Sequence, residues 1–556
     1  MDHEGLEERN MDGSGFIRNY VEKHKKELEE LRAKAKALEF KGQWFIIGDD
    51  EYPQKRLQYA TTSFEEAEVS PRIILYPVGE EDIQKAMGLC RELGMAIAVR
   101  TGGHQYCGYS STLPVNMQID LSQTFPLYEY DAENNVLRCG VSHPLGDWAE
   151  KNHEQGIYLP MGVCAHVHLG GHVHTGGWGI VARSHGLLAD HVLAFDIIFS
   201  SGERERIVRP KEGKTTEHND DVYYAVLGGG KGGDFGIVTH WEFSPLRNKD
   251  YPNSACYTFL WLWSKEKMAA VVRRMEQLSK LCANGTVPSD YEFMLSITGY
   301  GWVDLLPDSM KSELSKLGFG NDLSIPVPPM IQMWMCFTNK GGLDEQFDDQ
   351  WFESFTAADV CGDPLVALRL KNTPVSEGLA QHFIMKRKRE MDYPYVKRAR
   401  VTMDLPKGFA ETYTERMYKI MSLPNALCQH LVSQMQIYAG GAVAENGKAG
   451  VTSYSWREQA LSMGHDSFYS VDWFCGDEHQ KAEQWQREND EVFIGQKAYA
   501  DADMRMFAYT FGARVLEEVW PYFYDSKDKY ERLRRIKGKL DPEGLFSADQ
   551  FALKPL

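Results

Sequence analysis

The sequence has no long apolar segment and no visible export signal. Nowhere does an uncharged apolar run approach the ~20 residues that a membrane-spanning helix requires. The opening residues, MDHEGLEERNMDGSG, lack a basic stretch followed by an apolar one, which is the pattern of a secretory signal. We therefore expect a cytoplasmic protein, with a secreted protein whose signal has been removed as the alternative.

Cysteine pairs at metal-binding spacing are also missing. The ten cysteines are scattered, and no two of them form a CxxC arrangement. This argues against a zinc ribbon and against a compact disulfide framework. Most of these thiols are expected to be small buried side chains or surface groups. Cys164 is the exception, because it stands in a glycine-rich motif.

Positive charge is in deficit. The chain has 61 Lys and Arg residues against 79 Asp and Glu residues, for a net charge of -18. Nucleic acids and anionic membranes offer such a chain no counter-charge, so neither is expected as a partner. A small neutral or weakly charged substrate fits better. The 556 residues exceed the ~250–300 that one hydrophobic core supports, so two packed domains are expected.

The chain divides by pattern and composition. Residues 16–40 carry apolar side chains at alternating spacings of three and four, which predicts a helix laid against the body of the protein. A short dimerising coil, and with it a homodimer, is the alternative. Residues 71–121 predict a strand, a helix and a second strand. Residues 247–495 are rich in Trp, Tyr, Met and Phe, which indicates a second α+β domain.

The first glycine-rich motif is RTGGHQYCGYSS, residues 100–111, directly after a predicted strand. Glycines at a strand end let backbone N–H groups turn toward an anion with no Cβ in the way, and a pyrophosphate fits such a nest. A tight turn is the ordinary explanation of a Gly-Gly pair. The motif is not GxGxxG, so it does not indicate a Rossmann site.

The second motif is GVCAHVHLGGHVHTGGWG, residues 162–179, whose glycines imply that the backbone passes close to something flat or charged. Its four histidines invite a metal site, since imidazole is a common zinc ligand. The carboxylate of an HxHxDH hydrolase motif is missing, because Gly170 and Gly171 stand in its place. A metal-dependent hydrolase is therefore kept as an alternative only.

Together the two motifs resemble those of the bicovalent berberine bridge enzyme-like flavoproteins, a family that includes hexose oxidase and glucooligosaccharide oxidase. DVYYAVLGGGKGGDFGIVT, QIYAGGAVAEN and YERLRRIKGKLDPEGLF extend the resemblance over residues 65–556. The resemblance implies an α+β protein of the vanillyl-alcohol-oxidase type, with a PCMH-type FAD-binding domain and a separate substrate domain of antiparallel sheet flanked by helices. The expected parts are an N-terminal helical extension (1–45), the FAD-binding domain (46–246), the substrate-binding domain (247–495) and a C-terminal segment returning to the FAD domain (496–556).

The resemblance also implies FAD bound through two covalent bonds, from His104 to the 8α-methyl group of the flavin and from Cys164 to its C6. The first motif would bind the pyrophosphate of FAD, and the second motif would bind its flat ring. The ring itself supplies the redox chemistry. No metal is expected. The residues implied in cofactor binding are His104, Cys164, Arg100, Thr101, Gly102, Gly103, Gln105, Gly108, Tyr109, Ser110, Gly162, Val167, Gly170, Gly171, His172, Gly176, Gly177, Gly179, Ile180, Gly236, Ile237 and Val238.

In the family a base removes the proton of a substrate hydroxyl while a hydride moves to the flavin. The tyrosine of the family's YxN motif corresponds to Tyr509, although Phe511 replaces the asparagine. Asp472 falls near a position where relatives carry Glu or Gln, and it is a candidate proton relay or base. Gln436 is a third candidate. A packed core tyrosine and a solvent-facing strand carboxylate are the competing explanations of the first two.

Two further positions concern the pocket. Trp178 replaces an active-site tyrosine of many plant relatives, which implies a more apolar wall. Val167 matches a gatekeeper position where valine accompanies access of O2, so the resemblance favours an oxidase that acts on CH–OH groups and forms H2O2. The alternatives are a flavin dehydrogenase with another acceptor and a binding module without turnover. A sugar or related alcohol is the expected substrate, with phenols, alkaloids and polyketides as alternatives.

Overall fold

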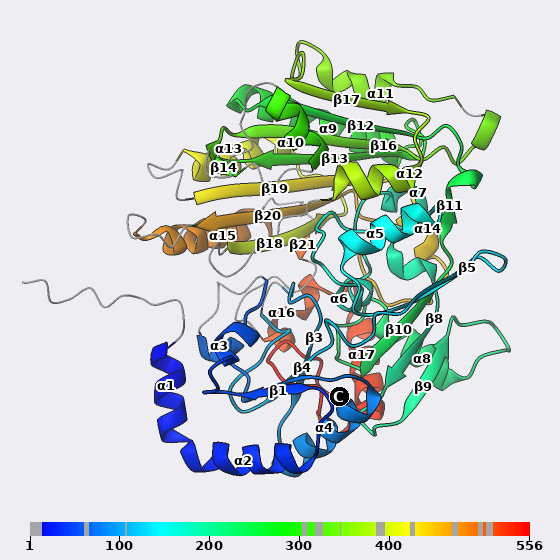
Figure 1. The fold of residues 1–556 in the computed structure, drawn as a ribbon. Coiled ribbons are helices and arrows are strands. Elements are labelled where there is room, and N and C mark those ends of the chain that lie inside the picture. The colour runs from blue at the N-terminus through cyan, green and yellow to red at the C-terminus, as the bar shows by residue number, and fades with distance from the viewer. Residues whose placement is uncertain are drawn as a thin grey trace, which may run out of the picture.

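The chain folds into two packed halves, one built on two smaller sheets and the other on an eight-stranded sheet (Figure 1). In the described part of the chain, no helix combines the length and the apolar character needed to cross a membrane. The computed structural model describes residues 14–59, 66–105, 108–302, 308–316, 326–344, 346–384, 395–422, 429–469, 476–498, 504–506 and 515–556.

The predicted N-terminal helix is in fact two helices, α1 (Ser14–Lys23) and α2 (Lys25–Ala37). The break falls at His24, whose φ of -113° and ψ of 21° depart from helical geometry. Figure 1 shows α2 running across the direction of α1. The apolar face of α2 is buried in the same core as the first sheet, so the expected packing against the body is confirmed.

The first sheet has the strand order β1-β2-β4-β3, in which β2, β4 and β3 are parallel and β1 is antiparallel. Helix α4 (Glu80–Leu93) connects β2 to β3, with acidic residues in its first turn and a left-handed Gly94 at its end. The predicted strand–helix–strand unit is therefore confirmed. The strands are β1 (Gln43–Ile46), β2 (Ile73–Tyr76), β3 (Ile97–Arg100) and β4 (Met117–Asp120).

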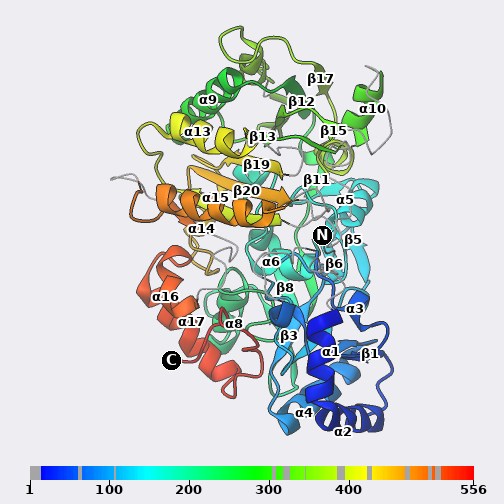
Figure 2. The ribbon, with the colours of Figure 1, turned by 90° about the vertical axis from the view of Figure 1, so that its left-hand side faces the viewer.

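The second sheet is antiparallel, in the order β5-β6-β10-β8-β9, and shares its hydrophobic core with the first. Helix α17 (Lys527–Leu540) lies beside α8 (Glu217–Val226) in this half (Figure 2), and its apolar side chains enter the same core. The strands are β5 (Tyr128–Asp131), β6 (Val136–Gly140), β8 (Val192–Ile198), β9 (Arg204–Val208) and β10 (Ile237–Phe243).

The eight-stranded sheet is antiparallel throughout, in the order β17-β12-β16-β13-β19-β20-β18-β21. Its last strand, β21, follows residue 495, so the sheet recruits chain beyond the boundary expected for the second domain. The strands are β12 (Ala255–Leu262), β13 (Tyr291–Thr298), β16 (Met330–Phe337), β17 (Val366–Lys371), β18 (Tyr395–Thr402), β19 (Gln429–Ile437), β20 (Leu461–Tyr469) and β21 (Met504–Met506).

Helices α9 (Lys265–Ala283), α13 (Phe409–Met421) and α15 (Glu478–Phe493) cover one face of this sheet (Figure 2). Because side chains alternate along a strand, the other residues of each strand face the first half of the molecule. That second face carries several polar side chains, although the strands are buried on both sides.

Shorter elements connect these units, and two pairs of them, β7 with β11 and β14 with β15, form two-stranded sheets. They are α3 (Tyr52–Lys55), α5 (Leu145–Glu154), β7 (Ile157–Tyr158), α6 (Leu169–His174), α7 (Ala182–His185), β11 (Leu246–Arg247), β14 (Gly301–Trp302), α10 (Asp308–Lys316), β15 (Pro326–Val327), α11 (Gln350–Glu353), α12 (Val375–Glu377), α14 (Ala442–Gly447) and α16 (Leu516–Val519).

A buried arginine joins the two halves. Arg183, on α7, is fully buried, and its guanidinium donates to four backbone carbonyls of the second half. Beside it, Glu292 of β13 accepts hydrogen bonds from the backbone N–H and the hydroxyl of Ser184, both at 2.6 Å. Burial raises the pKa of Glu292 to about 7. These contacts fix how the large sheet is seated on the first half.

Replacing this guanidinium should loosen the seating of the sheet. Arg183→Met is expected to lower the free energy of unfolding by about 3 kcal/mol or more, because several buried carbonyls lose their donor. Thermal and denaturant unfolding would measure the loss. Arg487→Met, at an exposed position on α15, is the control and should change stability by less than about 0.5 kcal/mol. Equal stability of the two variants would contradict this role.

Candidate cofactor site

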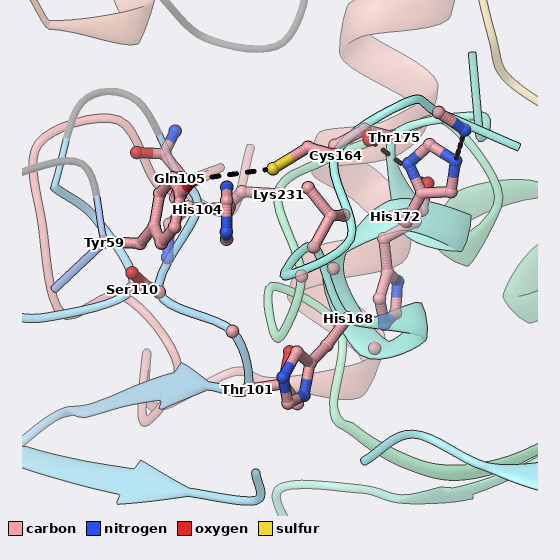
Figure 3. Close-up of a pocket in the computed structure, with 18 of the residues that line it drawn as sticks. Tyr59, Thr101, His104, Gln105, Ser110, Cys164, His168, His172, Thr175 and Lys231 are labelled. Carbon is pink, nitrogen blue, oxygen red and sulfur yellow. Dashed lines mark hydrogen bonds between the residues drawn. The ribbon is translucent and has the colours of Figure 1, made fainter. Parts of the chain in front are cut away.

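A cavity of about 220 Å³ lies between the two halves of the molecule (Figure 3). One side is formed by the loop after β3, by the loop around α6 and by the glycine cluster at residues 231–236. The opposite side is formed by β18, β19 and β20. All three glycine-rich segments of the sequence therefore meet at one place, facing the large sheet.

Arg100 is the last residue of β3 and anchors the first glycine-rich loop. Its buried guanidinium pairs with Asp120 and donates to the carbonyls of Lys55 (2.7 Å) and Leu57 (2.8 Å) and to the hydroxyl of Tyr76 (2.9 Å). Arg100 lines the cavity, but its donors are engaged by protein groups. Its role is therefore to fix the position of the loop.

The first two glycine-rich loops are in contact with each other. A Cβ added to Gly102 would lie 2.7 Å from the carbonyl oxygen of His166, and one added to Gly170 would lie 2.7 Å from the methyl group of Thr101. Side chains at these positions would push the loops apart. The glycines thus allow the two loops to pack closely, in addition to any contact with a ligand.

His104 and Cys164 approach a common neighbour, Tyr59. The phenol ring of Tyr59 stacks on the imidazole of His104 with 3.6 Å between centroids. Its hydroxyl lies 3.6 Å from the sulfur of Cys164. Among the free cysteines in the described part of the chain, Cys164 is half-buried and the other six are buried. Two reactive side chains from separate loops therefore converge at one end of the cavity (Figure 3).

The histidines of the second motif are held apart by different partners. His172 accepts a hydrogen bond from the backbone N–H of Gly162 (3.2 Å), and the ring of His174 packs edge-on against Trp241. Burial lowers the pKa of both imidazoles to about 4, so they are neutral. Within the described ranges, no three His, Cys, Asp or Glu side chains are grouped to hold a metal ion.

Lys231 interrupts the third glycine cluster and lines the cavity with a buried positive charge. Its ammonium lies 2.9 Å from Asp549 and 3.7 Å from Asp234. Burial raises the pKa of Asp234 to about 6. Because Asp549 belongs to the last residues of the chain, the C-terminal segment helps to fix this wall of the cavity.

The sheet side of the cavity is polar. Lys397 on β18 donates to Asp466 on β20 at 2.7 Å, and Gln434 on β19 lies one row along the sheet. Trp178, from the second loop, donates through its indole N–H to Ser462 of β20. The lining residues on this side are Tyr395, Lys397, Ala399, Val432, Gln434, Gly464 and Asp466.

Most cofactor residues expected from the sequence line the cavity. Tyr509 and Asp472, expected as catalytic residues, lie outside the described residues. Those that line it are Arg100, Thr101, Gly102, Gly103, His104, Gln105, Tyr109, Ser110, Gly162, Cys164, Val167, Gly170, Gly171, His172, Gly236 and Val238, together with Trp178.

Gln436 does not line the cavity, contrary to its expected catalytic role. Its side-chain amide is buried and donates to the carbonyl of Gly179 at 2.9 Å. Gln434, two residues earlier on the same strand face, lines the cavity instead. Gln436 therefore supports the glycine loop from behind.

Several expected cofactor residues likewise stand behind the lining. Gly176 is packed against the ring of Tyr454, and a Cβ on Gly177 would lie 2.3 Å from that of Leu188. A Cβ on Gly179 would lie 1.9 Å from a backbone carbonyl oxygen. These glycines are required for packing. The residues outside the lining are Gly108, Gly176, Gly177, Gly179, Ile180 and Ile237.

The sequence interpretation missed several lining residues. Tyr59 precedes the region of resemblance, and no motif marks it. Lys231 carried a signal, since a charged residue inside a glycine cluster is unusual for a plain turn. Gly464 and Asp466 also carried a signal, because a glycine inside a strand and a carboxylate two residues later share one face of that strand.

The comparisons with known proteins agree with this architecture. Residues 71–207 match the family described as "FAD binding domain". Berberine bridge enzyme-like 16 of Arabidopsis thaliana is 28% identical over 197 residues, which cover 35% of this chain and 34% of that protein. Aclacinomycin-N/aclacinomycin-A oxidase of Streptomyces galilaeus is 33% identical over 174 residues, 31% of each chain. The chain thus matches about a third of the length of these two relatives.

Solved structures match over nearly the whole chain. Physcomitrella patens BBE-like 1 has a TM-score of 0.67 at 16% identity and covers 95% of this chain and 100% of its own. The carbohydrate oxidase from Microdochium nivale has a TM-score of 0.68 at 16% identity and covers 95% and 99%. The fold and the matched domain define an FAD-binding protein with a PCMH-type fold. The resemblance to the berberine bridge enzyme-like flavoproteins is thereby confirmed.

One glycine of the cavity fits a site that holds a cofactor. Gly171 lines it, and a Cβ added there would meet no protein atom within 4 Å. Packing within the protein therefore does not require a glycine at position 171. We attribute this opening to the space for the cofactor, with the glycine loops, His104 and Cys164 around it.

Filling that opening should displace FAD while leaving the fold intact. Gly171→Ala is expected to purify with a severalfold lower ratio of flavin to protein, because the new methyl group projects into the cavity. Absorbance of the purified protein measures the ratio, and far-UV circular dichroism checks the fold. Gly88→Ala, at an equally open position on α4, is the matched control. A fully loaded Gly171→Ala variant would contradict this account.

The buried imidazole of His172 should make the fold sensitive to acid. Its pKa is about 4 in the folded protein and 6.5 in an ordinary environment. As the pH falls below 6.5, the unfolded chain therefore binds the proton first, and the stability declines until about pH 4. The melting temperature of His172→Gln should fall less steeply over this range than that of the unmodified protein. Gly88→Ala, which removes no titratable group, should leave the slope unchanged.

Proposed function

We propose that this protein is an FAD-dependent oxidase that removes a hydride from the CH–OH group of a small alcohol, with His104 and Cys164 bound covalently to the same flavin. O2 then accepts the electrons and H2O2 is formed. The observation that carries the proposal is the contact of one side chain, Tyr59, with both His104 and Cys164. Bound FAD supplies the electron acceptor at this place.

The character of the two attachment residues supports the proposal. A covalent bond to the flavin requires an accessible nucleophile. Cys164 is the half-buried thiol among the described free cysteines, whereas burial raises the pKa of thiols such as Cys90 and Cys139. His104 lines the same cavity. The contact of both side chains with Tyr59 at the cavity supports their attachment to one flavin.

The nature of the relatives supports an alcohol substrate. Several proteins with this fold are oxidases of carbohydrates, including a chitooligosaccharide oxidase and the xylooligosaccharide oxidase from Myceliophthora thermophila. Val167 lines the cavity, as expected of a residue that governs access of O2. A dehydrogenase that uses another electron acceptor is the competing possibility within the same chemistry.

Digestion of denatured protein should yield two linked peptides that share one flavin, one peptide containing His104 and the other Cys164. His104→Ala and Cys164→Ala should each retain flavin through acid precipitation, since one bond remains, and the double variant should release it. Mass spectrometry of the peptides and absorbance of the precipitate measure both results. Flavin that is freely released from the unmodified protein would contradict the proposal.

Peroxide formation separates the two oxidoreductase functions. An oxidase should form one H2O2 for each substrate oxidised in air. Reduction of an artificial dye without peroxide would identify a dehydrogenase instead. Val167→Leu is the informative variant, because a larger side chain should slow the reaction with O2 and leave anaerobic reduction by substrate unchanged.

A further inference from the structure

Two cysteines of the large sheet stand directly opposite each other. Cys256 is on β12 and Cys336 is on the neighbouring strand β16, and the two residues are partners in the antiparallel register. Their sulfur atoms are 3.7 Å apart, although the residues are 80 positions apart in the sequence. Both thiols are free and buried in this structure.

The pair occupies a position where the two backbones come close together. Just beyond the register of β12 and β16, the backbone N–H of Trp263 donates to the carbonyl of Pro329 at 2.9 Å. Hydrogen-bonded and non-hydrogen-bonded pairs alternate along an antiparallel ladder, so Cys256 and Cys336 form a non-hydrogen-bonded pair. The Cα atoms of such a pair are ~4.5 Å apart. That separation lies within the ~4.4–6.8 Å that a disulfide spans.

The other neighbour of β16 agrees with this placement. The backbone N–H of Thr338 donates to the carbonyl of Asp290, just before β13, at 2.9 Å. Alternate residues of β16 therefore direct their backbone groups toward β13, and Cys336 is one of them, with Glu292 as its partner there. No backbone hydrogen bond of this ladder is expected between Cys336 and Cys256, which leaves the two side chains close to each other.

The surrounding residues hold the two thiols together. Cys256 and Cys336 belong to an apolar cluster that also contains Tyr158 and Val181 of the first half. Gly378 covers Cys256, since a Cβ added to that glycine would lie 2.4 Å from the sulfur atom. The sulfur therefore has no room to move away on that side. Packing thus keeps the pair in contact without a bond between the sulfur atoms.

We propose that Cys256 and Cys336 form a site of oxidative modification, at which hydrogen peroxide joins them in a disulfide. One sulfur attacks an oxygen of H2O2, the O–O bond breaks, and water leaves with the thiol proton while the sulfur becomes a sulfenic acid. The second thiol then attacks that sulfur. The S–S bond forms, and the hydroxyl group leaves with the second thiol proton as water. Two thiols are thus oxidised, and one peroxide is reduced to two waters.

The proximity of the thiols, and not a high reactivity, determines the product. The hydrogen bond with Cys256, together with burial, raises the pKa of the Cys336 thiol well above its ordinary value. Because the thiolate is the reactive form, the first step should be slower than at an exposed thiol. A sulfenic acid on either residue then has the other thiol beside it, which favours the disulfide over further oxidation. The proposed function would supply H2O2, although any other source of peroxide serves equally.

The disulfide would fasten two strands near the place where the halves of the molecule join. Glu292, which accepts hydrogen bonds from Ser184 of the first half, is the next residue of the same row on β13. The new bond would also close a loop that spans 80 positions, which restricts the unfolded chain. The oxidised protein should therefore resist thermal unfolding better than the reduced protein.

Peptide mapping of the flavin-loaded protein tests the site. The protein is incubated with H2O2 and alkylated while it is denatured, so that thiols and disulfides cannot exchange. Trypsin cuts after Lys and Arg, which places Cys256 on the peptide 250–265 and Cys336 on the peptide 317–340. We expect these two peptides to be joined after peroxide and separate after reduction. Alkylated thiols after prolonged treatment, sulfinic acids, or linkage to other cysteines would overturn the proposal.

Variants connect the bond to stability. The melting temperature of the unmodified protein should rise by ~3 °C or more after peroxide, and dithiothreitol should reverse the rise. Cys256→Ala and Cys336→Ala should each prevent both the linkage and the rise. Cys282→Ala, which removes another buried thiol of the same half, is the matched control and should preserve both. A rise of equal size in Cys256→Ala would contradict the stabilising role of this pair.

The test is separate from that of the proposed function, because peroxide is added and no turnover is needed. An unlinked pair in protein that carries covalent flavin would refute the site and leave the proposed function standing. Linked peptides in protein that carries no covalent flavin would do the reverse.

Discussion

Close contact between backbone segments at glycine determines the shape of the cavity. The loops that carry His104 and Cys164 touch at Gly102 and at Gly170, where an added Cβ would come within 2.7 Å of the other loop. Because the loops touch there, the two reactive side chains approach one common neighbour, Tyr59. Their separation is thus set by the main chain, which moves less than side chains do.

Docking of the large sheet depends on this same arrangement. The loop that ends at Gly179 accepts a hydrogen bond from Gln436 of β19, and Trp178 donates to Ser462 of β20. Arg183 supplies the main tie further along the same segment. The segment that contains Trp178, Gly179 and Arg183 therefore contributes to the cofactor site and also fixes the position of the large sheet relative to that site. A change in the glycine loop would alter both walls of the cavity.

Local pattern was enough to predict part of this architecture. In the strand–helix–strand unit that ends at Arg100, apolar residues recur at regular spacing, acidic residues begin the helix and a glycine ends it. This unit is present as expected. The break at His24 was not predictable, because apolar spacing continues through it. The choice between Gln434 and Gln436 was not predictable either, since both share one strand face and only the docked loop decides which is covered. Contacts between segments far apart in the sequence do not affect the spacing of apolar and polar residues, so they cannot be predicted from it.

The two walls of the cavity hold their charged side chains in different ways. The cationic side chains on the cofactor side, Arg100 and Lys231, are buried and held by Asp120 and Asp549, which lie outside the lining. Each charge is thus balanced by a carboxylate behind the wall, and the two residues hold the loops on the cofactor side in position. In the described lining the carboxylate stands on the opposite wall, at Asp466. Because the walls belong to different sheets, a substitution on β18, β19 or β20 can change the wall opposite the loops and leave the contacts between the loops themselves unchanged.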